Sequence, residues 1–390
     1  MISPYFLKNT PQAALKNAGW GWMLGSDTLP YLTNEVVLVK PAETEAYYEA
    51  ANTLYDCYVE AAQYIIDHNL WEEAGIPANL VEMIKLTWED DRHWHLYGRF
   101  DLAGGVDGKP IKLIEFNADT ATCIPETAVV QWAHLKANGL EESPQFNTLY
   151  EALLGQFEKL REKNTDLTPT LLISTMRDYP EDDTNAAVLG EAAREAGFDV
   201  EYAFVDEVEL SAADGIFKLN AENKQFEKFD FWFKLLPWEF IGHDEPEMAD
   251  LLTQIVKNRK AVVLNPAYTL LFQSKYLLKV LWDLFPYHPL LLRTETKPLI
   301  DRPSVEKVLF GREGANVRIL EETGAVSASI SGEYGDQGRI YQEYVEFPRD
   351  AVGQHYQAGV FFAGEACALG FRRGGKIIDN TAQFVGHLVQ

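Results

Sequence analysis

The spacing of hydrophobic side chains predicts helices in the first quarter of the chain. Residues 43–71 carry apolar side chains at helical spacing without an internal Gly or Pro, and residues 76–91 repeat the pattern more briefly. We therefore expect the first 95 residues to be mostly helical. The many aromatic residues here are more typical of core packing than of a ligand site.

From Tyr97 the hydrophobic period changes from that of a helix to two, the period of a strand. Residues 97–104 and 111–119 are predicted to form two strands joined at Asp107-Gly108, a dipeptide typical of tight hairpin turns. Residues 125–139 return to helical spacing and end at Gly139, a residue type favoured just after a helix.

The middle of the chain alternates between strand and helix patterns. A strand at 168–175, a helix at 182–198 and a strand at 199–210 follow one another, and a further apolar run at 229–240 is broken at Pro237. Strand–helix–strand at this spacing indicates a parallel sheet, so this region is predicted to be α/β.

The last third of the chain has an α+β pattern. We expect an amphipathic helix at 268–285, followed by strand segments at 305–320, 338–348 and 359–378. With 390 residues, 47% of them hydrophobic, the chain is long enough for two or three structural units.

The charge composition narrows the range of partners. The chain has 59 acidic and 34 basic residues, a formal net charge of −25, and such a surface repels nucleic-acid backbones. The apolar runs fall far short of about 18 residues, so no membrane span is expected, and no secretory signal is visible. Three cysteines without a CxxC spacing argue against disulfides and structural zinc and fit a reducing cytoplasm.

Polar residues in the predicted hairpin raise the question of its register. With a two-residue turn, Glu115 and Asn117 would lie on the opposite face from Asp101. A three-residue loop, or a bulge at Gly104-Gly105, would instead set Asp101 opposite Glu115 and Arg99 opposite Asn117. Oxygen ligands on neighbouring strands suit Mg²⁺ bound with a nucleotide phosphate. A salt-bridge network of the arginine and the two carboxylates is an equally open alternative.

The glycine-containing loop at 311–316, Gly-Arg-Glu-Gly-Ala-Asn, could bind phosphate through its backbone N–H groups. Its spacing matches neither the P-loop nor the dinucleotide-binding fingerprint, and a plain hairpin turn is the more common alternative. Arg312 could neutralise a transferring phosphoryl group, and Lys307 could reach the other phosphates.

Other ionisable residues are predicted to be mostly structural. Lys234 and Lys275 lie in apolar surroundings, where a lysine more often extends its ammonium to solvent than meets a buried anion. His93 and His95 form no metal-binding pattern, and no G-x-S-x-G nucleophile motif occurs. Asp119 is expected to cap or brace the turn into the helix that follows the hairpin.

A set of motifs occurs along the chain in a fixed order. They are GRFD (98–101), LIEFNADTAT (113–122) with ETAVVQW (126–132), FKLLPWEF (233–240), QSK (273–275) with FPYHPLLL (285–292), GREGANV (311–317), IYQEY (340–344) and GFR…FVGH (370–387). Together they resemble the glutathionylspermidine synthase family, an ATP-grasp-like group of carboxylate–amine ligases. The resemblance extends from about residue 15 to the end of the chain and is closest to a stand-alone synthetase branch, without the amidase domain of bifunctional members.

The resemblance implies roles for individual residues. Asp101, Glu115 and Asn117 match the family's Mg²⁺ ligands, and Arg99 matches an arginine near the γ-phosphate and acyl group. Positions matching the nucleotide site are Lys275, Lys307, Gly311, Gly314, Gln342, Glu343 and Arg372 (the last at a phosphate or peptide site), with Arg312 as a second catalytic arginine on the loop that closes over ATP. Positions matching the substrate sites are Thr120 and Thr122 near the acid, and Glu181, Asp182 and Asp183 in the region of the polyamine site.

The implied fold is a mixture of α+β and α/β structure in three parts. Residues 1–165 would form a helical region with the metal-binding hairpin (97–119), residues 166–265 an α/β preATP-grasp-like substrate domain, and residues 266–390 an ATP-grasp-like nucleotide domain. The implied reaction uses ATP and Mg²⁺: a peptide-like acid takes the γ-phosphoryl group to give an acyl phosphate, and an amine or polyamine then attacks the acyl carbon. No residue stands out as the general base for the amine.

Two departures from the family pattern keep other functions open. The family's Lys-Pro is Lys307-Val308 here, and Arg373-Gly374 replace the acidic residues that commonly follow the C-terminal arginine. The alternative is a non-catalytic ATP-binding protein with the ligase fold. A third hypothesis is a glycosidase that uses Asp101 and Glu115 as its carboxylate pair.

Overall fold

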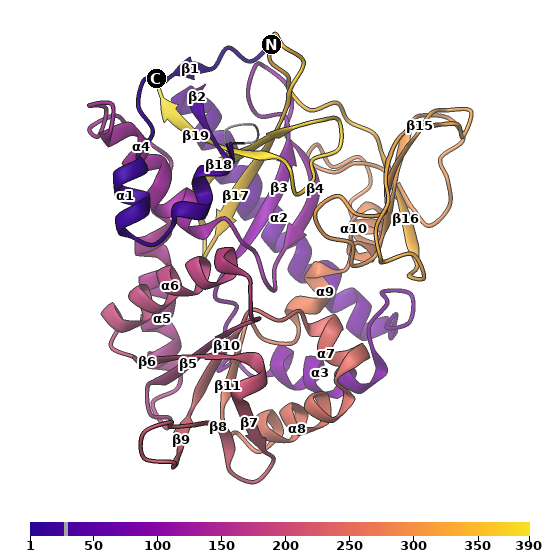
Figure 1. Ribbon diagram of the computed structural model, residues 1–390. Coiled ribbons are helices and arrows are strands. Elements are labelled where there is room, and N and C mark those ends of the chain that lie inside the picture. The colour runs from indigo at the N-terminus through magenta and orange to yellow at the C-terminus, as the bar shows by residue number, and fades with distance from the viewer. Residues whose placement is uncertain (27–29) are drawn as a thin grey trace.

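Four β-sheets and the helices around them make up the described chain, residues 1–26 and 30–390 of this computed structural model (Figure 1). A seven-stranded sheet lies in the upper half of the view, a parallel sheet with its helices in the lower half, and a five-stranded sheet at the right. Within these ranges, none of the helices combines the length and the hydrophobicity needed to cross a membrane. The predicted mixture of α/β and α+β structure is confirmed.

Strands from both ends of the chain share the seven-stranded sheet. Its order is β1-β2-β19-β18-β17-β3-β4; β19 and β2 are parallel, and the other neighbours are antiparallel. The strands are β1 (Tyr5–Phe6), β2 (Leu32–Val39), β3 (Gly98–Ala103), β4 (Lys112–Asn117), β17 (His355–Phe362), β18 (Ala366–Gly374) and β19 (Gln383–Val389). The segments 1–165 and 266–390 therefore contribute to one sheet, and their division into domains stays a prediction.

The N-terminal quarter is helical only in part. Helices α2 (Pro41–His68) and α3 (Val81–Glu89) form where the spacing predicted them. Strand β2, preceded by the short helix α1 (Gln12–Asn17), contradicts the mostly helical prediction. Its buried residues do not alternate simply, and it pairs with β19 from the far end of the chain, so no local pattern marks it as a strand.

The hairpin of β3 and β4 has the register that brings its polar residues together. Asp101 pairs with Glu115, and Arg99 pairs with Asn117, as the second of the two predicted registers requires. Because alternate residues of a strand point to the same side, all four side chains lie on one face of the hairpin.

The turn of this hairpin is confirmed, but its irregularity lies at another place than predicted. Asp107 and Gly108 both have positive φ, as the tight turn requires. The pairing shifts between Asp101 and Leu102, so that Ile114 bulges out of β4, whereas Gly104-Gly105 lie beyond the end of β3. A bulge inserts one unpaired residue, which changes the face on which the following residues lie.

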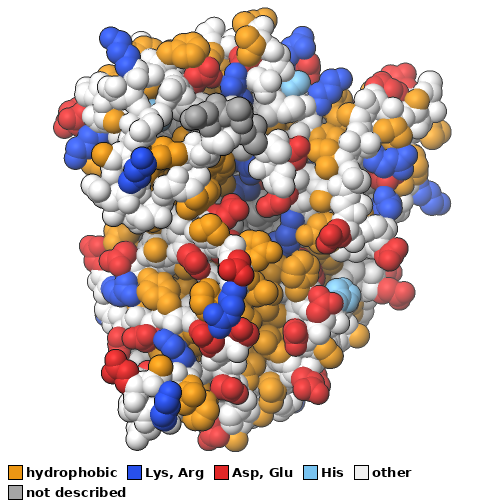
Figure 2. All heavy atoms as spheres, viewed as in Figure 1, with side chains coloured by type: hydrophobic (Ala, Val, Ile, Leu, Met, Phe, Trp, Pro, Cys, Tyr) orange, Lys and Arg blue, Asp and Glu red, His pale blue; other side chains and the backbone are white. Residues whose placement is uncertain are grey.

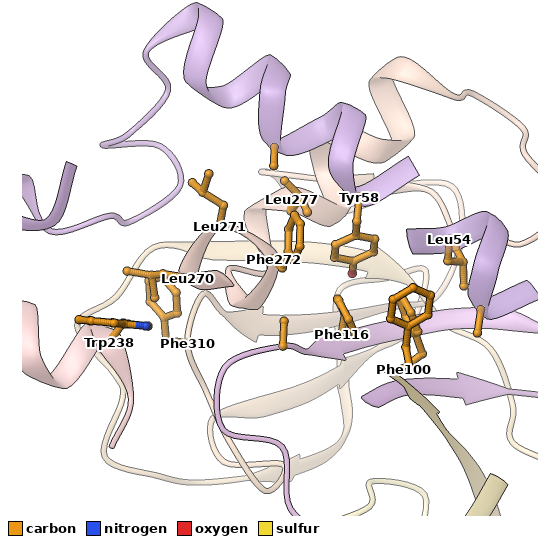
Figure 3. Packing of buried hydrophobic residues seen from close by; sticks show 14 of the residues in the cluster. Leu54, Tyr58, Phe100, Phe116, Trp238, Leu270, Leu271, Phe272, Leu277 and Phe310 are labelled. Carbon is orange, nitrogen blue, oxygen red and sulfur yellow. The ribbon is translucent and has the colours of Figure 1, made fainter. Parts of the chain in front are cut away.

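Aromatic packing on the opposite face of the hairpin holds this register. Phe100 and Phe116 are cross-strand partners whose rings stack 3.8 Å apart, and Tyr58 of α2 packs 5.2 Å from the ring of Phe116. Figure 3 shows Tyr58 pointing from α2 toward Phe116, beside Phe272. A slip by one residue would expose these rings and bury the charged face, so the apolar face determines where the charged residues lie.

The predicted α/β region forms a parallel sheet of order β11-β10-β5-β6. Its elements are β5 (Thr170–Thr175), α6 (Pro180–Glu195), β6 (Asp199–Phe204), β10 (Phe231–Lys234), α7 (Trp238–Asp244), α8 (Pro246–Lys257) and β11 (Val262–Leu264), with α5 (Leu149–Lys163) ahead of them. The strand predicted at 199–210 is divided, and its second part joins a small antiparallel sheet of β7 (Val208–Ser211), β8 (Gly215–Leu219) and β9 (Phe226–Phe229).

The last sheet has the order β12-β16-β13-β14-β15. Its strands are β12 (Thr294–Glu295), β13 (Ser304–Val308), β14 (Val317–Leu320), β15 (Val326–Ile330) and β16 (Arg339–Glu343). The helix predicted at 268–285 is broken into α9 (Thr269–Gln273) and α10 (Tyr276–Leu284), and the helix predicted at 125–139 consists of a π-helical turn (Glu126–Val130) and α4 (Gln131–Lys136). Single 3₁₀ turns lie at Gly21–Leu24, Ala78–Leu80 and Val205–Glu207.

A buried ion pair joins the exit of the hairpin to the parallel sheet. Lys234 and Asp119 are both fully buried, and the Lys234 Nζ lies 3.2 Å from the Asp119 Oδ1, which contradicts the prediction that this lysine reaches solvent. The Asp119 Oδ2 accepts the backbone N–H of Trp238 at 2.9 Å, so Asp119 braces the start of α7 and not the helix after the hairpin. Burial raises the pKa of Asp119 and lowers that of Lys234, and each charge is stabilised by the other.

This pair predicts a large loss of stability when one partner is removed. Lys234→Met leaves the buried Asp119 carboxylate without its cation, and we expect the free energy of unfolding to fall by about 3–5 kcal/mol. Lys228→Met, which removes a half-exposed lysine from its contact with Asp230, should cost less than about 1 kcal/mol. Urea unfolding of both variants measures the difference, and equal losses would contradict the structural role of the pair.

Candidate active site

An apolar pocket of about 90 Å³ lies between the five-stranded sheet and β4. Its walls are mostly aliphatic, with Val305, Val308, Ile319, Val345, Ile377 and Ile378 among them. Glu115, Lys275, Lys307, Gly311, Gly314, Gln342 and Glu343 also line it, so the structure brings the residues predicted for the nucleotide site together, except Arg372. An apolar slot with lysines at one side can accept a flat ring at one end and anionic groups at the other.

A larger polar cavity of about 670 Å³ adjoins this pocket. Figure 2 shows acidic and basic side chains gathered around a hollow between the upper and lower halves of this face. The predicted residues that line the cavity are Arg99, Asp101, Glu115, Asn117, Thr120, Thr122, Glu181, Asp182, Arg312, Gly314 and Arg372. The apolar pocket and the polar cavity share Glu115 and Gly314, so the two spaces meet at the hairpin and the glycine loop.

Two lysines lie near Glu115 at this junction, and one of them, Lys275, contacts it. The Lys275 Nζ lies 3.4 Å from the Glu115 Oε2 and donates to the Gly311 carbonyl oxygen at 2.7 Å. Lys307 donates to the Ile114 carbonyl oxygen and to the Gln342 side chain. Burial alone would raise the pKa of Glu115, but the lysines hold it below its ordinary value, and burial lowers the pKa of Lys307 to about 8.

Lys275 owes its position to the break between α9 and α10. Its backbone N–H donates to the Leu309 carbonyl oxygen at 3.0 Å, while the preceding Ser274 hydroxyl donates to the Ala74 carbonyl oxygen at 2.7 Å. The break therefore turns Lys275, which is 5% exposed, toward Glu115 and away from solvent. For this lysine too, the more common expectation of an exposed ammonium is wrong.

Arg99 and Asp101 form an ion pair on the charged face of the hairpin. Arg99 donates through Nε to the Asp101 Oδ1 at 2.7 Å and through Nη2 to the Oδ2 at 3.2 Å, and Asn117 donates its amide to the same carboxylate at 3.1 Å. Gly359 of β17 pairs with Asp101 of β3. A Cβ at Gly359 would lie 3.0 Å from the Arg99 side chain. Glycine at this position leaves room for the arginine beside the sheet.

The predicted magnesium ligands would supply only part of the coordination of the ion. Asp101, Glu115 and Asn117 offer two carboxylates and one amide oxygen on one face, which is the kind of ligand set that Mg²⁺ uses together with phosphate oxygens. The described residues contain no group of three or more His, Cys, Asp or Glu side chains arranged around a metal. The donor set therefore fits a metal whose coordination is completed by nucleotide phosphates. Among themselves, the protein side chains form the salt-bridge network.

The glycine loop docks onto the hairpin and α7 through Arg312. Its Nη1 donates to the Thr120 hydroxyl at 3.0 Å, and its Nη2 forms an ion pair with Glu239. Its guanidinium also lies over the Phe240 ring, 5.7 Å from the centroid. The loop is thus held to the segment after the hairpin and to α7. A plain hairpin turn would not require such contacts.

Acidic residues at the start of α6 form one side of the polar cavity. Glu181 and Asp182 line it, whereas Asp183 does not and instead accepts the Thr175 hydroxyl at 2.7 Å. Burial, together with the neighbouring charges of Glu181, Asp183 and Glu313, raises the pKa of Asp182 to about 7. These carboxylates can attract a cation, although the cavity also contains arginines.

The two adjacent C-terminal arginines point to different surroundings. Arg372 lines the polar cavity and donates to the Asp379 carbonyl oxygen at 2.7 Å. Arg373 lies outside that cavity and pairs with Asp350 at 3.0 Å and with Glu35 at 3.7 Å. The departure from the family pattern at Arg373 therefore does not alter the cavity.

The cavity also contains residues to which the sequence assigned no role. Glu126, 2% exposed, accepts the Tyr31 hydroxyl at 2.6 Å, and burial raises its pKa. Glu239 does not line the cavity itself but contacts Arg312, which does. Glu126 and Glu239 both fall within motifs of the chain, ETAVVQW and FKLLPWEF, but only the fold reveals what they contact.

Known proteins of similar sequence are named as ligases. A Haemophilus influenzae protein named "Putative acid--amine ligase" is 30% identical over 367 residues, covering 89% of this chain and 87% of that protein. The bifunctional glutathionylspermidine synthetase/amidase of Escherichia coli is 27% identical, covering 88% of this chain and 56% of that protein. Trypanothione synthetase of Crithidia fasciculata is 24% identical, covering 83% and 52%.

The fold and the sequence both have a counterpart among known families. A glutathione synthetase-like effector (GSS30) of Globodera pallida, solved in its apo form, aligns with 99% of this chain and 100% of its own at a TM-score of 0.55 and 11% identity, which shows similarity of fold alone. The family model described as "Glutathionylspermidine synthase preATP-grasp" matches residues 5–390. The chain belongs to the glutathionylspermidine synthase family, as the ordered motifs predicted.

Proposed function

We propose that this chain is an ATP- and Mg²⁺-dependent carboxylate–amine ligase that forms an amide bond through an acyl phosphate. The observation that carries the proposal is the meeting of an apolar pocket and a charged cavity at Glu115, between Lys275 and the Arg99–Asp101 pair. Family membership and the names of the relatives support a C–N bond-forming enzyme, as the sequence predicted.

ATP would place its adenine in the apolar pocket and its phosphates toward the lysines. Gln342 and Glu343 line the pocket, the Gln342 side chain accepting from Lys307 at 2.9 Å, and Lys275 and Lys307 lie where the pocket borders the charged face of the hairpin. The γ-phosphate would then lie near Glu115, at the entrance to the polar cavity. Mg²⁺ held by Asp101, Glu115 and Asn117 would neutralise phosphate charge during the transfer.

The acid and the amine would approach from opposite sides of the polar cavity. A carboxylate of a peptide-like acid would bind near Arg99, Thr120 and Thr122, and an amine or polyamine cation near Glu181 and Asp182. The carboxylate oxygen attacks the γ-phosphorus, and the bond to ADP breaks. The amine then attacks the acyl carbon, phosphate leaves with the C–O electron pair, and the ammonium proton passes to a base. Arg99 and Arg312 stabilise charge on the transferring group.

A non-catalytic ATP-binding protein is the second candidate, and one observation favours it. Val308 replaces the proline that usually follows the nucleotide-site lysine, and it lines the apolar pocket. The other departure, Arg373, lies outside the cavity. A glycosidase fits the geometry less well, because the lysines hold the pKa of Glu115 below its ordinary value, while a general acid needs a raised one.

Removal of the Glu115 charge should strongly slow the phosphoryl transfer. With ATP, Mg²⁺ and a panel of peptide-like acids and amines, we expect Glu115→Gln to lower ADP release by about 100-fold or more, a size typical of one lost electrostatic contact in a transition state. Glu141→Gln, an exposed substitution of the same kind, should leave the rate unchanged. ADP release that persists in Glu115→Gln would rule out the mechanism, and any amide product detected by mass spectrometry would exclude the non-catalytic alternative.

The acidic side of the cavity predicts a pH dependence of amine binding. Because the pKa of Asp182 is about 7, this carboxyl is mostly neutral at pH 6 and mostly ionised at pH 8, whereas an aliphatic amine stays protonated at both. We therefore expect spermidine to bind more tightly at pH 8 than at pH 6, by calorimetry. In Asp182→Asn this pH difference should shrink, and an unchanged difference would show that other groups control binding.

A further inference from the structure

Glu239 is fully enclosed and has one polar partner in the described structure. Its side chain is 2% exposed, and one carboxylate oxygen contacts the Arg312 guanidinium. The other oxygen, Oε2, is buried and meets no hydrogen-bond partner among the described residues. A buried carboxylate is costly to maintain, and here it is held almost entirely by one arginine. Among the described residues, Arg312 is thus the one group that makes a direct ion pair with the Glu239 carboxylate.

Four charges of alternating sign lie together at this place. Lys234 pairs with Asp119, Arg312 pairs with Glu239, and Glu239 interacts electrostatically with the first pair as well. Two cations and two anions make the group neutral as a whole. Loss of the Glu239 charge would leave two cations against one carboxylate.

Arg312 has its guanidinium fixed from three directions. Glu239 contacts Nη2, the Thr120 hydroxyl accepts from Nη1, and the Phe240 ring lies beside it. Its own loop contains three positive-φ residues, Glu313, Gly314 and Asn316, and the contacts of Arg312 help to hold this loop conformation. Without Glu239, the strongest of those contacts is lost.

From this geometry we infer that Glu239 is a positioning residue, which fixes the Arg312 guanidinium at the wall of the polar cavity so that it meets the γ-phosphate. Glu239 does not touch the reacting atoms; it acts through Arg312. The inference rests on the proposed function, because it takes the γ-phosphate of ATP as the group that Arg312 meets. It also assigns a role to the FKLLPWEF segment: α7 holds the glycine loop of the nucleotide site.

Binding of ADP and AMP-PNP with Mg²⁺ tests this without any knowledge of the acid or the amine. The ratio of the two dissociation constants reports the γ-phosphate contact alone. We expect the native chain to prefer AMP-PNP, and Glu239→Gln to lower that preference about tenfold while ADP binding changes less than twofold, the size expected for one charge-assisted hydrogen bond. Glu306→Gln is the matched control: Glu306 is also buried between arginines, Arg318 and Arg339, but lies outside both spaces.

A double variant separates positioning from a general loss of structure. If Glu239 acts through Arg312, then Glu239→Gln/Arg312→Gln should lose no more of the preference than Arg312→Gln alone. The double variant leaves neither charge of this pair unmatched, so it keeps the test available if Glu239→Gln is too unstable. An unchanged or increased preference in Glu239→Gln, or additive losses in the double variant, would overturn the inference and leave the proposed function intact. Absence of nucleotide binding by the native chain would overturn both.

Discussion

The structure depends on ion pairs between carboxylates near the hairpin and cations, three of which come from distant segments of the chain. Asp101 is paired by Arg99, Glu115 by Lys275, Asp119 by Lys234, and Glu239 by Arg312. A carboxylate buried without such a partner would cost several kcal/mol, which is a large part of the stability of a typical protein. Glu115 and Asp119 can therefore be paired only when the segments that carry Lys275 and Lys234 have reached their places.

These pairs join the three segments of the chain around one cavity. The hairpin lies in the segment 1–165, Lys234 and Glu239 come from 166–265, and Lys275 and Arg312 come from 266–390. The seven-stranded sheet links the first and last of these segments directly. The same interactions hence hold the fold together and arrange the polar groups of the cavity, and a substitution at one of them is expected to affect both.

Local patterns in the sequence predicted most of the helices and strands but not these pairings. The sequence left two registers of the hairpin open, and the observed one sets Asp101, Glu115 and Asn117 on one face while Phe100 and Phe116 stack on the other. The position of the bulge at Ile114, the strand β2 and the partner of Lys234 could not be predicted, because each depends on a contact with residues far along the chain. The apolar neighbours of Lys234 in the sequence do not indicate that it pairs with Asp119, which is 115 positions away.

The distribution of charge inside the cavity favours a ligase over a protein that only binds ATP. Although the net charge of the chain is −25, Arg99, Arg312 and Arg372 face this space, with lysines at its junction with the apolar pocket. Nucleotide binding alone would need these cations and nothing more. The side formed by Glu181 and Asp182 would repel phosphate, and its carboxyl with a pKa of about 7 would be of no use to a nucleotide. A cavity that contains both cations and anions suits a reaction that brings an anionic acid and a cationic amine together.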